Sequence, residues 1–306
     1  MRAPLCEIGP ADLFGAAAIE DPHPLFARIR ERHAISRIAE TGVHLVATWD
    51  RIEEALEREA DFSANLTGVL IRGDDGLPAA LELPATGANQ VIATADEPDH
   101  AVHRAITQPR LAAARIAALE PQMREWVREA LDRWLGAGGG DFVPIAETIP
   151  ARALAHVLGL PDGDVTRFRR WAMMGGDMLA GDVSAARMGE LAVETAAMAD
   201  YLARHLEAAK AGREPASFAP LLHALAHGAL TGAIPFRDAV GISIVMFGAG
   251  GESTAALIGS AVRVLASDPG CADELRRHPD LTPRFVEEVV RLESPFKFHY
   301  RAVRRA

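Results

Sequence analysis

Residues 235–269 read PFRDAVGISIVMFGAGGESTAALIGSAVRVLASDP, and this stretch decides the fold. Between Ala239 and Ala266 it carries only two charges, Glu252 and Arg263, and apolar residues lie on every side of a 3.6-residue repeat. This pattern predicts one buried helix, and a helix of about 30 residues is about 45 Å long, the width of a whole domain. A membrane span has a similar length, but Glu252 among glycines and hydroxyls would be poorly tolerated in hydrocarbon. We therefore predict the core helix of a protein that does not cross a membrane.

The middle of this stretch combines small, acidic and alcoholic residues. Three of the four residues 248–251 are glycines, and Glu252, Ser253 and Thr254 follow them. Glycines weaken the helical backbone and hydroxyls compete for its carbonyls, so one interpretation is an opening lined by an acid and an alcohol. The other is a packing notch, at which the glycines let a second helix approach closely. The stretch alone supports both.

Composition excludes several classes of protein. The chain has 306 residues, 49% of them hydrophobic, enough for one large domain or two ordinary ones. Its net charge of −10 argues against a nucleic-acid partner attracted by bulk charge. The first residues, MRAPLCEIGPADLFG, lack the apolar run of a signal peptide, so we expect a cytoplasmic protein.

Helical patterns dominate the rest of the chain, which is rich in Ala, Leu, Arg and Glu. Alternating runs around Thr41 and Gly42 predict a hairpin, and no periodicity persists over 62–97, which we interpret as a lid or binding loop. The fold class is therefore mainly α, with a small β-layer formed by the hairpin and the extended tail after Pro295. Helices are predicted at 21–33, from 50, at 99–110, 118–136, 142–159, 164–179, 184–210 and 217–228, and after Pro269 and Thr282.

Two pairs of charged residues have helical spacing. His100 and Arg104 lie four residues apart, so they share a helix face that could bind a carboxylate or phosphate, although a solvated face is the commoner outcome. Glu288 and Arg291, three apart, can form an intrahelical ion pair, which by itself stabilises a helix by only about 0.2–0.5 kcal/mol.

Histidines and cysteines give no metal site by spacing. His223 and His227 are four residues apart, but no Glu follows the first and no third ligand is evident. Cys6 and Cys271 are too few for a disulfide scaffold and form no CxxC pair, so we expect two reduced thiols.

Taken in order, the motifs resemble a known family. The segments are DPHPLFARIRER (21–32), ATWDRIEEALEREADFSA (47–64), DEPDHAVHR (96–104), AGGEST (249–254), EEVVR (287–291) and SPFKFHYRAV (294–303). Together they resemble a bacterial cytochrome P450, a haem-thiolate monooxygenase. The resemblance implies a cytochrome P450-like helical fold over 1–306 as a single domain, divided into an N-terminal helix and hairpin (1–60), a lid loop (61–98) and a helical core (99–306).

The resemblance also implies roles for individual residues around haem b. His100, Arg104 and Arg301 match the residues that bind haem propionates. Ala249, Gly250, Glu252 and Ser253 match the oxygen-binding groove, whose acid and alcohol relay protons; Ser253 stands where the family usually has Thr, and Thr254 is a second candidate. Glu288 and Arg291 match a structural ion pair that a third, downstream residue completes. The positions that match the substrate pocket are Val245, Gly248, Ala249, Phe296, Lys297 and Phe298.

One expected element does not match. In this family a glycine-rich loop near the end of the chain carries the Cys thiolate that binds the iron. Neither Cys6 nor Cys271 has that context, so the resemblance implies a chain truncated before the ligand, with no iron ligand of its own.

The function expected from the resemblance is insertion of one atom of O₂ into a small apolar substrate. Electrons would come from NAD(P)H through a ferredoxin or flavoprotein reductase, and the fragment would be inactive on its own. The alternative is a degenerate relative without haem that binds a small molecule or a partner protein through the inherited cavity.

Overall fold

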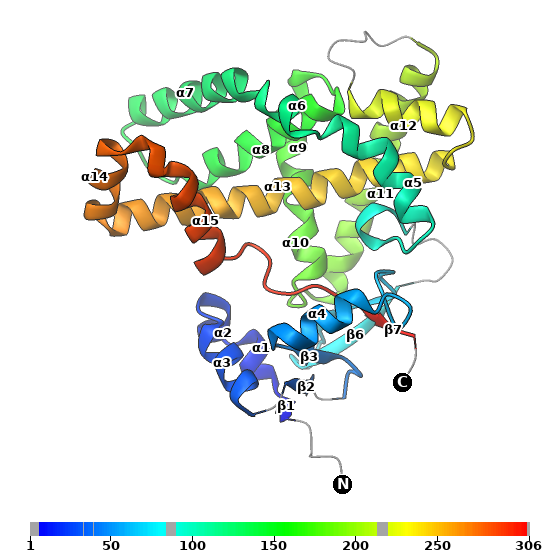
Figure 1. Ribbon diagram of the computed structural model, residues 1–306, viewed down its shortest axis with the longest axis vertical. Helices are drawn as coiled ribbons and strands as arrows, with labels where there is room; N and C mark the ends of the chain where they lie inside the picture. Colours follow the sequence, from blue (N-terminus) through cyan, green and yellow to red (C-terminus); the bar gives the residue numbers. More distant parts are fainter. Residues whose placement is uncertain (1–5, 33, 39, 84–89, 213–219, 305–306) are drawn as a thin grey trace. The chain divides into compact units, whose positions relative to one another are not determined.

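A computed structural model describes residues 6–32, 34–38, 40–83, 90–212 and 220–304. The chain is mainly helical with three small sheets, which confirms the predicted fold class (Figure 1). It forms two compact units. The first contains Met1–His100, Gly176–Glu194 and Tyr300–Ala306, and the second contains Ala101–Gly175 and Thr195–His299. The single domain with the divisions given above stays a prediction.

The first unit begins with a helical and stranded layer. Its helices are α1 (Pro10–Phe14), α2 (Ala16–Glu20), α3 (His23–Arg32) and α4 (Trp49–Glu57). Strands β1 (Cys6–Ile8), β2 (Ile35–Ile38) and β3 (His44–Val46) form one sheet, in which β2 and β3 are antiparallel, as the predicted hairpin requires. Ile8, Ile29 and Ile38 are almost fully buried together beneath it. Every second residue of β2 is buried, so one side of this strand faces the core of the layer.

A second hairpin was missed by the sequence analysis. Strands β5 (Gly68–Arg72) and β6 (Pro78–Glu82) pair in register, and Gly76 takes a left-handed φ of 77° in the connection between them. The prediction of a segment without regular structure over 62–97 is therefore wrong for its described part. The run GVLIR is too short and too evenly apolar to show a strand period.

The tail pairs with a different strand from the one expected. Strand β7 (Ala302–Val303) is antiparallel to β4 (Phe62–Ser63), whereas we expected the tail to join the early hairpin. Tyr300 holds this segment in the first unit: its hydroxyl accepts a hydrogen bond from the Leu70 amide and donates to the Leu179 carbonyl, both at 3.3 Å. Burial raises the pKa of this phenol.

The second unit is helical. Three of its elements are 3₁₀ turns, at Gln108–Arg110, Asp162–Asp164 and Pro279–Leu281. The stretch predicted as one helix over 164–179 is divided at Met173, and the other helices lie close to their predicted ranges. Helices α5, α10 and α11 contain residues of both units. The helices are α5 (Asp99–Thr107), α6 (Ala113–Ala117), α7 (Glu120–Gly136), α8 (Val143–Leu158), α9 (Val165–Ala172), α10 (Met174–Leu179), α11 (Ala185–Lys210), α12 (Leu221–Leu230), α13 (Phe236–Ser267), α14 (Pro269–Arg277) and α15 (Thr282–Leu292).

Helix α13 is the centre of this unit and realises the predicted long helix. It packs against α8, α9 and α12, and its C-terminal part contacts α14 and α15 (Figure 1). Its buried residues follow one another at steps of three or four, apart from one adjacent pair: Ala239, Ile242, Ser243, Phe247, Gly251 and Ala255. One face of α13 is thus packed. Among the described residues α13 alone has the length and composition of a membrane span, properties that core helices share.

Candidate functional site

The glycines in the middle of α13 lie against other helices of the second unit. A Cβ atom added to Gly251 would lie 2.4 Å from the Cβ of Ala172 on α9, and one added to Gly250 would lie 2.8 Å from Leu154 on α8. A Cβ on Gly175 would likewise approach the Cα of Gly248 to 3.1 Å. The packing-notch interpretation therefore describes these glycines, because a side chain at Gly251 would have no room.

The acid and the alcohols lie beside this notch, on the more open side of the helix. Ala249 is exposed, and Glu252 and Ser253 are partly buried. Glu252 and Ser253 lie three and four residues after Ala249, so both neighbour it on the helix surface and the three form one stripe. The Ser253 hydroxyl donates to the Ala249 carbonyl at 2.8 Å, and that of Thr254, which is exposed, donates to the Gly250 carbonyl at 2.9 Å. The helix is continuous from Phe236 to Ser267. The close packing thus accounts for the glycine side of α13, and the opening lined by Glu252 and Ser253 stays a prediction.

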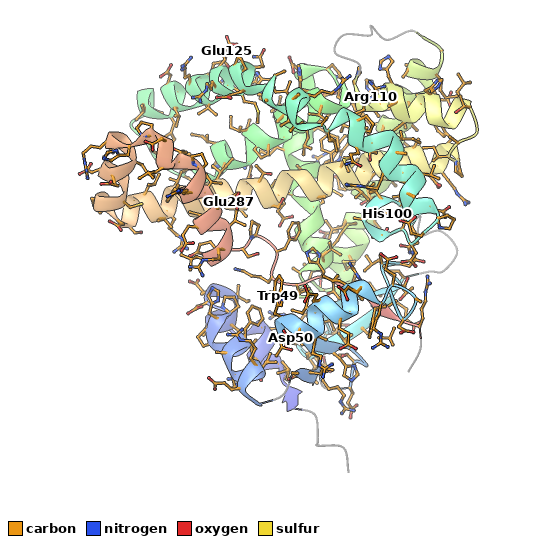
Figure 2. The ribbon with its side chains drawn as sticks, in the orientation of Figure 1. Trp49, Asp50, His100, Arg110, Glu125 and Glu287 are labelled. Atoms are coloured by element: carbon orange, nitrogen blue, oxygen red, sulfur yellow. The ribbon has the colours of Figure 1, made fainter. Side chains whose placement is uncertain are left out.

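The residues matched to haem propionates lie on α5 and in the tail. His100, labelled in Figure 2, lies in the first turn of α5, and its Nδ1 is 2.9 Å from Glu97 Oε1. Arg104 follows one helical turn later, is exposed, and pairs with none of the carboxylates that the structure describes. Arg301 is exposed and donates from Nη1 to the Tyr300 carbonyl at 2.9 Å. Each of these guanidinium groups, Arg104 in the second unit and Arg301 in the first, could by itself bind a carboxylate.

The expected pocket residues fall into two groups within the second unit. Val245, Gly248 and Ala249 lie on α13, on or next to the stripe of Glu252. The other group, Phe296, Lys297 and Phe298, follows α15, is exposed, and contains the Phe296 ring 5.3 Å from that of His299.

Glu288 and Arg291 form the intrahelical ion pair that their spacing predicts. On α15, marked by Glu287 in Figure 2, Arg291 Nε donates to Glu288 Oε2 at 2.8 Å and Nη2 donates to Oε1 at 2.6 Å. The Glu288 and Arg291 side chains are 55% and 65% exposed. Hydrogen bonds from Arg291 lower the pKa of the Glu288 carboxyl, and the same bonds raise that of Arg291. The pair is thus formed, but in solvent.

Haem fits these residues only in part. Arg104 and Arg301 offer donors for its carboxylates, but Cys271 does not match an iron ligand at the groove. It lies in the first turn of α14, where its backbone amide donates to Asp268. From Glu252 to the end of α13 is about 22 Å at the rise of an α-helix. Among described residues no group of three His, Cys, Asp or Glu side chains could hold a metal, and the Cys6 side chain is outside them.

Sequence reasoning missed a basic pocket on the second unit. Arg133 of α7, Arg152 of α8 and Arg169 of α9 line one cavity of about 400 Å³. These residues are far enough apart in sequence that no spacing rule connects them, and only the packing of three helices brings them together.

Comparison with known proteins identifies the class. No protein-family model matches the chain. It is 36% identical over 302 residues to Cytochrome P450 144 of Mycobacterium tuberculosis, which covers 96% of this chain and 67% of that relative. Vitamin D(3) 25-hydroxylase of Pseudonocardia autotrophica is 26% identical, with 93% and 67% covered. The structure of cytochrome P450 CYP109Q5 from Chondromyces apiculatus superposes with a TM-score of 0.76 at 21% identity, covering 97% of this chain and 71% of that one.

These likenesses define a cytochrome P450 fold, in which the long helix carries the acid–alcohol stripe. The chain belongs to the cytochrome P450 family. It spans about two thirds of the length of the relatives it matches.

Proposed function

We propose that this chain is the oxygen-binding and propionate-binding part of a monooxygenase that inserts one atom of O₂ into a small apolar substrate. The observation that carries the proposal is the stripe on α13, where Glu252 and Ser253 lie beside an exposed Ala249. The relative named as a vitamin D(3) 25-hydroxylase supports an apolar substrate of similar character. The family's thiolate ligand would come from a segment equivalent to the third of the relatives that this chain does not span.

The haem would be held through its propionates. His100, Arg104 and Arg301 would donate to the carboxylates. The two arginines suit this role because neither guanidinium group has a carboxylate partner among the described residues. When bound, the haem supplies dioxygen activation, a chemistry that no side chain here provides.

The protein's own contribution at the groove is to hold and move protons. The Ser253 hydroxyl hydrogen points to the Ala249 carbonyl, which leaves the oxygen lone pairs of Ser253 to accept a proton. Glu252, the residue before Ser253 on the helix, is the acid that would supply protons from solvent. Thr254 makes the equivalent bond to Gly250, so it is the second candidate for the alcohol.

The remaining parts of the proposal come from the family resemblance. Val245, Gly248 and Ala249, with residues 296–298, would face the substrate. Electrons from NAD(P)H would arrive through a ferredoxin or a flavoprotein reductase in the cytoplasm.

Haem titration tests the proposal. The purified chain is titrated with haem and followed by absorbance, and Arg104→Gln is compared with Arg284→Gln, a control that removes an exposed arginine from α15. Losing a charge-assisted hydrogen bond should weaken haem binding by roughly ten- to a hundredfold in Arg104→Gln alone. Equal affinities in both variants would contradict the propionate assignment. If the wild-type chain binds no haem at all, the haem-free relative becomes the better account.

A further inference from the structure

The cavity of about 400 Å³ on the second unit is lined by no residue of α13. It is formed where α7, α8 and α9 meet, and its polar lining comprises Glu129, Arg133, Thr148, Arg152, Thr166 and Arg169. Cavities of this size are typical of small-molecule sites. None of these residues has a role in the monooxygenase proposal.

Positive charge exceeds negative charge around this cavity. Arg152 Nη1 is 3.4 Å from Glu129 Oε2, and Arg169 Nε is 2.5 Å from Glu147 Oε2. Two carboxylates therefore face three guanidinium groups. Glu129 lies one turn before Arg133 on α7, at a spacing that permits an ion pair, but it is directed to Arg152 instead. Within the described residues Arg133 consequently pairs with no carboxylate.

Not every N–H group of Arg152 has a hydrogen-bond partner. Its guanidinium lies over the Trp126 ring, 4.6 Å from the ring centre, and its side chain is only 18% exposed. The Nε atom is buried without a hydrogen-bond partner. A long contact to Glu129 and an unpaired, buried N–H are costly for a largely buried cation, and such groups are usually satisfied by a ligand or water. Stacking on Trp126 nevertheless holds the planar group in place beside the cavity.

We propose that this pocket binds a phosphate dianion, either as free phosphate or as the phosphate group of a small phosphorylated molecule. Three guanidinium groups from three helices surround the space, and a tetrahedral dianion offers acceptors to all of them. A carboxylate has only two oxygens for three guanidinium groups, whereas a phosphate has at least three and so can accept from each of them. The hydroxyls of Thr148 and Thr166 add neutral hydrogen-bonding groups to the same lining.

Binding is measured through thermal unfolding of the full chain. Inorganic phosphate, glucose 6-phosphate and acetate are titrated separately, with sodium chloride added to keep the ionic strength constant. Wild-type protein is compared with Arg133→Gln and with Arg128→Gln, which removes an exposed arginine of α7 outside this cavity. Both positions are on the surface of one helix, so both variants should fold.

The two phosphate compounds should raise the unfolding temperature of the wild type and of Arg128→Gln, and acetate should not. Arg133→Gln should bind phosphate roughly ten- to a hundredfold more weakly. Tighter binding of glucose 6-phosphate than of phosphate would identify a phosphorylated small molecule, and the reverse order would identify free phosphate. The proposal is overturned if phosphate acts no more strongly than chloride, if acetate matches it, or if the two variants respond alike.

Discussion

At the scale of single residues, hydrogen bonds to the helix backbone orient the hydroxyl groups of Ser253 and Thr254. Each hydroxyl donates to the carbonyl four residues earlier, at 2.8 and 2.9 Å, so each proton has a fixed position. The sequence predicted this competition for carbonyls from residue types alone. It left open whether the glycines line an opening or let another helix approach, and the structure shows Gly250 and Gly251 packed against α8 and α9.

The Glu288–Arg291 pair provides a pH prediction at this scale. Hydrogen bonds from Arg291 lower the pKa of the Glu288 carboxyl in the folded chain. A lowered folded pKa favours folding above the unfolded pKa, and this contribution is lost as the pH falls through the folded pKa. The pair is fully solvated, so we expect a change in titration and little change in stability.

The carboxyl-carbon NMR signal of Glu288 measures this titration directly. In Arg291→Gln its pKa should rise towards the usual range for Glu. Arg284→Gln, on the same helix, should leave the titration of Glu288 unchanged. A Glu288 pKa that is the same with and without Arg291 would show that the pair does not form in solution.

At the scale of elements, α13 was predictable and the β5–β6 hairpin was not. Thirty-two residues of apolar pattern with few charges leave no alternative to a helix. The hairpin's strands have five residues each, and the connection between them contains Gly73 and Gly76. Such short strands next to glycines were interpreted as part of a loop. Their pairing is a contact between strands, which single-strand periodicity does not report.

The glycines of α13 give a matched pair of substitutions. In Gly251→Ala the new Cβ would lie 2.4 Å from Ala172, so α9 must shift and the free energy of unfolding should fall by about 1–3 kcal/mol. Gly259 has nothing within 4 Å of an added Cβ, and Gly259→Ala should raise it by about 0.5–1 kcal/mol through helix propensity. Urea denaturation of both variants checks the two signs. A lower free energy of unfolding in Gly259→Ala, or an unchanged one in Gly251→Ala, would contradict the close packing of Gly251 against α9.

At the scale of the whole molecule, the family and the helical fold were predictable because several motifs occur in order along the chain. The positions of the proposed propionate donors on α5 and in the tail follow from that order. The basic pocket was not predictable, because it depends on how α7, α8 and α9 pack. The second unit also exposes apolar side chains near the end of the matched region, among them Val290, Leu292 and Phe296. We expect the Cys-bearing segment of a complete enzyme to cover them.

The carbon monoxide spectrum of the reduced haem complex tests the central claim most directly. It is recorded for the chain alone and for the chain co-expressed with the remaining C-terminal third of Cytochrome P450 144. The account predicts a thiolate-type band only when the Cys-bearing segment is present, because Cys271 lies on α14, away from the stripe on α13. A thiolate-type band from the chain alone, or haem bound in neither sample, would contradict it.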